Sequence, residues 1–133
     1  MATIVPLFGG EDRLTVKANG EDLTAGQLVK ITAFTAGELL AAKSVATGGA
    51  DAAMNVDADD GEKGAAVILV PGTVMKLQSE TGVAAGDLVK SSANGKVTTA
   101  SPSANNAACD DGLIIIGRAL TAVSGGFATV LIK

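Results

Sequence analysis

The 133-residue sequence contains no histidine, tryptophan or tyrosine, and its only aromatic residues are Phe8, Phe34 and Phe127. Histidine is the usual general base near neutral pH and the commonest metal-binding side chain, so its absence argues against most acid–base enzymes and against zinc or copper sites. Tryptophan and tyrosine supply most of the surfaces on which bases and sugars stack. We therefore expect a protein that is not an enzyme and that takes no cofactor or metal.

Clusters of basic residues and long apolar runs are also missing. The 10 lysines and arginines are scattered singly among 14 acidic residues, for a net charge of −4. Such a pattern does not match the charge of a phosphate backbone, so we expect no nucleic-acid partner. The longest aliphatic runs, 65–70 and 113–116, are too short to cross a bilayer, and the N-terminus lacks the features of a signal peptide. We expect a soluble protein with no membrane partner, made in a reducing compartment.

Motifs that carry chemistry are absent as well. The single cysteine, Cys109, cannot form an internal disulfide, and no histidine is present to activate its thiol. The acidic stretch 55–62 resembles a calcium loop, but the sixth position is Asp60 and the twelfth is Ala66, where an EF-hand needs Gly and Glu. We interpret this stretch as a solvated acidic loop.

Strand signals dominate what is present. Alternation of apolar and polar residues predicts strands at 14–17, 27–32 and 73–78, the last with Lys76 facing outward between Met75 and Leu77. Further strands are expected at 66–70 (buried on both faces), 87–91, 96–99, 113–121 and 127–132. The Asn94-Gly95 pair predicts a hairpin over 91–97, because both residues tolerate the positive φ of a tight primed turn.

An internal repeat organises these strands. The sequence AGQLVK at 25–30 recurs as AGDLVK at 85–90. By analogy with the strand that follows the second copy, residues 38–44 are expected to form a strand, although the local propensity also allows a helix. A low-complexity stretch follows in each copy (45–64 and 100–112), and then an aliphatic return strand (67–70 and 113–116). We predict an all-β fold, a compact β-barrel or sandwich with pseudo-repeated halves, with both low-complexity stretches as surface loops. Coincidence among common residues is the alternative explanation of the repeat.

The N-terminal residues differ from the rest. An apolar segment precedes Gly9-Gly10 and Glu11-Asp12, which separate it from the first alternating strand. We expect residues 1–12 to form an extended arm that docks on a neighbouring molecule, and residues 13–133 to form a single β-barrel domain. The arm residues predicted to contact a capsid or another subunit are Thr3, Ile4, Val5, Leu7 and Phe8.

The second half resembles a known family. The segments 85–90 (AGDLVK), 95–98 (GKVT), 115–120 (IIGRAL) and 128–132 (ATVLI) follow in the order of motifs found in the small capsid decoration proteins of tailed bacteriophages, a family first defined as a domain of unknown function in prophage head gene clusters. The resemblance covers about the last 50 residues. It implies a β-barrel on the outer surface of the virion capsid that binds the major capsid protein, usually as a homotrimer, and cements neighbouring coat subunits. It also implies synthesis in a bacterial cytoplasm and no catalytic residues.

An alternative function is a carrier module. Val74-Met75-Lys76-Leu77 resembles the Met-Lys-Met tetrapeptide of biotinyl and lipoyl carrier domains, which would make Lys76 an attachment site. In such domains the modified lysine protrudes at a hairpin tip, whereas Lys76 here lies inside a predicted strand. A third possibility, an orphan β-barrel enzyme or regulator, is disfavoured by the missing residue types.

Overall fold

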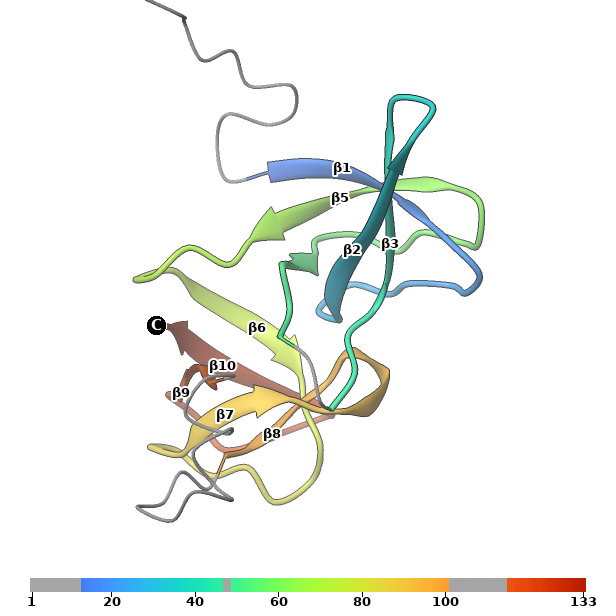
Figure 1. Ribbon diagram of the computed structural model, residues 1–133. Coiled ribbons are helices and arrows are strands. Elements are labelled where there is room, and N and C mark those ends of the chain that lie inside the picture. Colours follow the sequence, from blue (N-terminus) through green and yellow to red (C-terminus); the bar gives the residue numbers. More distant parts are fainter. Residues whose placement is uncertain (1–12, 47–48, 101–114) are drawn as a thin grey trace, which may run out of the picture.

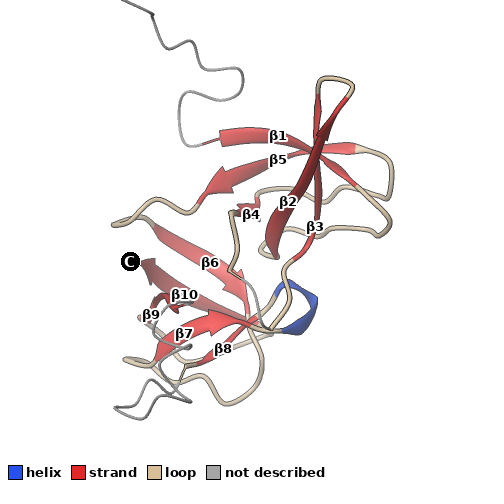
Figure 2. Cartoon of the chain, viewed as in Figure 1, coloured by secondary structure: helices blue, strands red, loops and turns tan. Residues whose placement is uncertain are grey.

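The computed structural model describes residues 13–46, 49–100 and 115–133, and the predicted all-β fold is confirmed. The first half contains β1 (Arg13–Ala18), β2 (Leu28–Thr35), β3 (Glu38–Lys43), β4 (Ala52–Met54) and β5 (Lys63–Ile68). The second half contains β6 (Val74–Gln78), β7 (Leu88–Ser91), the helical turn η1 (Ala93–Gly95), β8 (Val97–Thr99), β9 (Ile115–Ala119) and β10 (Phe127–Ile132). Figures 1 and 2 show the two halves stacked one above the other.

The first five strands close into a barrel, and the last five form a sheet. The barrel order is β1-β3-β2-β4-β5, with β5 returning to pair with β1. Its pairs are antiparallel except for β1 with β3, which is parallel. The second sheet has the order β6-β10-β9-β7-β8, and all its neighbours are antiparallel.

The two halves are copies of one topology. The pairs β1–β5, β5–β4, β4–β2 and β2–β3 recur in the second half as β6–β10, β10–β9, β9–β7 and β7–β8. The parallel contact between β1 and β3 that closes the barrel is reduced in the second half to one parallel bridge, between Ser79 and Val97. The predicted repeat is therefore confirmed, and it extends over five strands in each copy.

The repeated sequence forms the same turn twice. Gln27 N–H donates to the Thr24 carbonyl at 3.1 Å, and Asp87 N–H donates to the Ala84 carbonyl at 3.1 Å. A second hydrogen bond, from backbone to side chain, closes each turn: Gln27 Oε1 accepts the N–H of Thr24 at 2.8 Å, and Asp87 Oδ2 accepts the N–H of Ala84 at 2.9 Å. The intervening glycines have φ of 85° and 91°, as the third position of a type II turn requires. Each turn leads directly into a strand, β2 or β7.

Three predictions about the loops and return strands are wrong. The stretch 45–64 is not only a surface loop, because it contains β4, whose three residues are all buried. With β4 included, β5 corresponds to β10 and β4 corresponds to β9. The predicted return strand 67–70 overlaps β5, whereas the predicted return strand 113–116 overlaps β9, so these two segments are not equivalent. The strand predicted at 66–70 is also not buried on both faces, since β5 ends at Ile68 and alternates between buried and less buried residues. Beyond Ala100, the other predicted loop lies outside the described residues as far as residue 112.

The hairpin predicted over 91–97 is present, and a second hairpin joins β2 to β3; both have tight turns with positive φ. Asn94 has φ 61° and ψ 29°, and Gly95 has φ 70°, as in a type I′ turn between β7 and β8. Residues 38–44 form strand β3 to Lys43, not a helix, and β3 pairs with β2 across a two-residue turn. This turn consists of Ala36 with φ 53° and Gly37 with φ 79°.

Ala36 provides a stability test of this second turn. A left-handed backbone conformation strains alanine, because its Cβ approaches the following carbonyl, whereas asparagine tolerates it. We expect Ala36→Asn to raise the free energy of unfolding by about 0.5 kcal/mol, as measured by urea denaturation. Ala36→Val, which places a β-branched side chain at the same φ, should lower it. A destabilised Ala36→Asn variant would show that the turn does not have this conformation.

The core consists of two aliphatic clusters that meet between the halves. The barrel cluster includes Val16, Leu23 and Val29, and the second cluster is centred on strands β6 to β10. Leu28 of β2 belongs to the second cluster, although Val29 next to it belongs to the barrel cluster. Successive side chains of a strand point to opposite faces, so β2 contributes to both cores. The two halves therefore share an apolar interface.

Candidate functional site

The predicted arm residues cannot be placed. Thr3, Ile4, Val5, Leu7 and Phe8 lie outside the described residues, so their contact role stays a prediction. The described chain begins at Arg13, which pairs with Val67 of β5. Val67 also lines a concave feature of the described surface.

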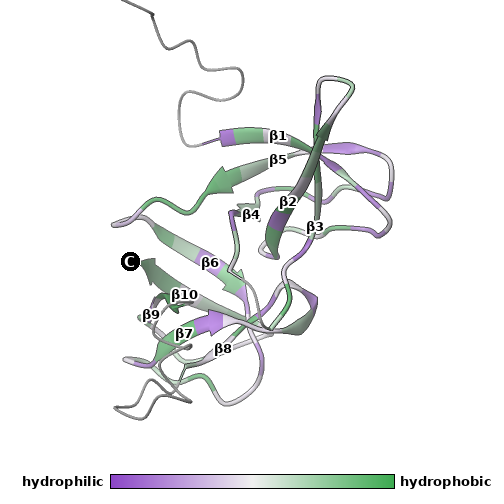
Figure 3. Cartoon of the chain, in the orientation of Figure 1, coloured by the Kyte–Doolittle hydropathy of each residue, from purple (hydrophilic) through white to green (hydrophobic). Residues whose placement is uncertain are grey.

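This feature is a groove between the barrel and the second sheet, with a volume of about 480 Å³. Val67 of β5 and most of β6 line it, and these two strands carry mostly apolar residues (Figure 3). The side chains and backbone that line it come from the turn before β2, from β4 and β5, from β6, and from the start of β10. The lining residues are Ala25, Gly26, Ala53, Met54, Asn55, Val67, Thr73, Val74, Met75, Lys76, Leu77 and Phe127. We refer to this feature as the β6 groove.

The absence of a side chain at Gly26 lets the turn before β2 pack closely against Phe127 and β6. A Cβ at this position would lie 2.7 Å from Cε2 of Phe127 and 3.4 Å from the backbone nitrogen of Gln78. The backbone also holds this contact directly, because Gln78 N–H donates to the Gly26 carbonyl at 2.8 Å. The glycine of the repeated turn therefore has two roles: it adopts a positive φ and it admits Phe127.

Lys76 lies at the rim of the β6 groove. It is exposed in the middle of β6, opposite Thr129 of β10, with buried Leu77 and half-buried Met75 beside it, as predicted. Its Nζ is 5.4 Å from the centroid of the Phe127 ring, a distance at which a cation attracts an aromatic face. Lys76 is not at a hairpin tip, which is the position that the modified lysine of a carrier domain requires.

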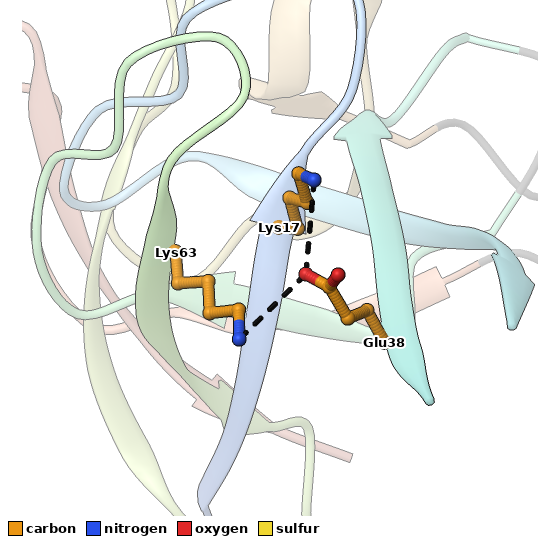
Figure 4. Close-up of polar contacts among 3 residues, drawn as sticks. All are labelled: Lys17, Glu38 and Lys63. Atoms are coloured by element: carbon orange, nitrogen blue, oxygen red, sulfur yellow. Dashed lines mark ion pairs between the residues drawn. The ribbon is translucent and has the colours of Figure 1, made fainter. Parts of the chain in front are cut away.

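The barrel seam carries a small charge network. Glu38 at the start of β3 faces Lys17 of β1 at 3.8 Å and Lys63 of β5 at 3.7 Å (Figure 4). All three side chains are partly exposed, so each pair contributes little stability. The carboxylate links the two strands on either side of β1, and we assign it a structural role.

The acidic segment also has a structural role. Carboxylate oxygens of Asp57 and Asp60 accept the backbone N–H of Ala25 at 2.8 Å and of Gly20 at 2.7 Å. Asp22 accepts the N–H of Asp60 at 2.8 Å. Within the described residues no three His, Cys, Asp or Glu side chains are placed to hold a metal ion. No helix in that part of the chain is long and apolar enough to span a membrane.

Reasoning from the sequence missed the β6 groove as a site. Its lining residues come from separate segments of the chain, and each of these residues has an ordinary strand or turn explanation on its own. The one available signal was Phe127, a rare aromatic residue placed directly after Gly125-Gly126.

Comparison with solved structures finds a protein of similar fold. No family model matches the sequence, and no curated protein matches it. The crystal structure of the head fiber gp8.5 N base in bacteriophage phi29 has a similar fold, with a TM-score of 0.73 and 16% sequence identity. The similarity covers 91% of this chain and 92% of that chain, so both halves of the duplicated fold are included.

Proposed function

We propose that this protein is a structural component of a bacteriophage virion that binds the outer surface of the capsid. The observation that carries the proposal is the fold likeness to the phi29 head fiber base over nine-tenths of both chains. The base of a fiber on a phage head is the part suited to holding it to the shell. The decoration-protein motifs in residues 85–132 of this chain point to the same location on a virion.

The finer proposal is that the protein acts as cement between neighbouring subunits of the major capsid protein. The described surface offers no metal cluster, and the single charged residue beside the β6 groove is Lys76. A role in covering seams needs only contacts, and weak contacts repeated over a lattice add up through multivalency. The core is rich in alanine, which buries little apolar area per residue, so association between copies would add stability. The family resemblance implies that the associated state is a homotrimer.

The test compares shells with and without the protein. Shells that lack it are expected to assemble but to rupture at a lower temperature, because a ligand that binds only the intact shell stabilises it by mass action. Light scattering and DNA release on heating would measure the difference. Bare shells as heat-resistant as decorated ones would contradict the cement role, and a protein that does not bind shells at all would contradict the capsid proposal.

Lys76→Arg serves as the control against the carrier hypothesis. Arginine keeps the positive charge at the rim of the β6 groove and its attraction to Phe127, so shell binding and shell stability should not change. A carrier domain would lose its attachment site with the same substitution. An intact mass with a covalent adduct on the wild-type chain, absent from the variant, would favour the carrier function instead.

A further inference from the structure

The strand β6 has one open edge. Ile132 N–H donates to the Thr73 carbonyl at 2.8 Å, and Ser79 N–H donates to the Gly126 carbonyl at 2.8 Å, so the backbones of residues 73 and 79 face β10. Backbone groups alternate in direction along a strand, and those of Val74 and Lys76 therefore point away from β10. In the described part of the chain, no strand pairs with β6 on this side.

This open edge runs along the β6 groove. Val74 and Lys76 both line the groove, together with the apolar side chains of Met54, Val67 and Phe127. Gln78, the next residue with its backbone on this side, donates to Gly26 across the end of the groove. An extended peptide placed here would gain backbone hydrogen bonds from β6 and an apolar floor for alternate side chains, which is how strand addition works.

The N-terminal segment has the properties of such a peptide. Residues 3–8 (TIVPLF) are almost entirely apolar and rich in β-branched residues. Pro6 has no N–H and must face away from β6, which leaves Val5 and Leu7 to donate toward the strand. Pro6 would then protect the new outer edge against further pairing.

The position of Arg13 favours a second copy as the donor. Arg13 pairs with Val67 on the β1 side of β5, whereas the β6 groove lies on the β4 side. A chain folding back into its own groove would have to turn within residues 9–12 and carry Glu11 and Asp12 past the apolar end of β5. Removing carboxylates from water there is unfavourable. Twelve extended residues span about 40 Å, enough to reach a neighbouring subunit.

We propose that residues 3–8 of one copy add as a strand to the edge of β6 in another copy, filling its β6 groove. In this arrangement the N-terminal segment of each subunit binds the β6 groove of the next subunit. Such contacts form a closed ring only when the subunits are related by rotational symmetry, as in a trimer with three-fold symmetry. The proposal concerns contacts between copies of this chain and can be tested without capsid shells. Its failure would leave the proposed capsid function standing.

The test uses two single-cysteine chains. Both carry Cys109→Ser, one carries Val5→Cys and the other Val74→Cys, and a tag gives them different lengths. After mixing and mild oxidation, a disulfide-linked heterodimer is expected on a non-reducing gel. In the control, Val45→Cys replaces Val74→Cys. Val45 is as exposed as Val74 (54% against 55%), but it is not among the residues that line the β6 groove. Equal cross-linking in the control, or no heterodimer, would overturn the proposal.

A chain that carries both Val5→Cys and Val74→Cys tests the alternative in which the N-terminal segment binds the groove of its own chain. If this chain forms only a fast-migrating intrachain disulfide while the mixed chains do not cross-link, the segment binds its own groove and the exchange is wrong. Sedimentation gives an independent measurement. Val74→Asp and deletion of residues 1–8 should each weaken self-association at least tenfold, whereas Val45→Asp should leave it unchanged. Self-association that is equally strong in all three variants would contradict the proposal.

Discussion

Gly117→Ala is expected to unfold a large part of the population, with a loss of about 3 kcal/mol in the free energy of unfolding. Gly117 lies in the middle of β9, where it pairs with Val89 of β7 on one side and Ile132 of β10 on the other. A Cβ there would overlap the carbonyl oxygen of Leu131 and lie 3.1 Å from the Cα of Ile132. These are backbone atoms, so relief requires β10 to move away from β9.

Urea denaturation measures this effect, and Gly49→Ala is the matched control. A Cβ added to Gly49 would have no heavy atom within 4 Å, and Gly49 has no positive φ, so alanine should change the free energy of unfolding by less than about 0.5 kcal/mol. The equivalent of Gly117 in the first half is Ala52, which pairs with Ile68 in the same way. Equal stability of the Gly117→Ala and Gly49→Ala variants would mean that β9 and β10 are as far apart as β4 and β5.

The second large effect is expected for Leu28→Ala. Leu28 has 0% exposure and packs in the cluster that contains Leu77, Val89 and Val130, although it belongs to the barrel strand β2. Truncating a fully buried leucine removes transfer free energy and leaves a cavity, for a loss of about 3 kcal/mol. Leu88, its counterpart in the second copy of the repeat, is only partly buried. Leu88→Ala should therefore cost about 1 kcal/mol.

The Leu28→Ala and Leu88→Ala variants also test whether the two halves of the protein unfold in one transition. Because Leu28 joins both halves, its loss should lower the midpoint of one cooperative transition, observed equally by circular dichroism and by hydrogen exchange in β1–β5 and in β6–β10. Separate transitions for the two halves, with only one shifted by Leu28→Ala, would show that the shared cluster does not couple them.

Several features of this protein could be predicted from the sequence because they depend on neighbouring residues. The repeated AG-Q/D-LVK motif specifies a type II turn and the strand after it, since glycine supplies the positive φ and the Gln27 or Asp87 side chain bonds back three residues. Asn94-Gly95 specifies a primed turn for the same local reason. The alternation over 73–78 predicted which face Lys76 occupies, because strand side chains alternate whatever the partner strands are.

Other features were decided only by the tertiary structure. The short strand β4 is three residues of Ala-Ala-Met within an acidic loop, and it becomes a strand because β2 and β5 pair with it on both sides. The closure of the barrel, the burial of Leu28 in the other half's core and the β6 groove all depend on how two similar sequences pack against each other. Local sequence determines turns and faces through backbone conformation, whereas strand partners and grooves depend on contacts between residues far apart in the chain.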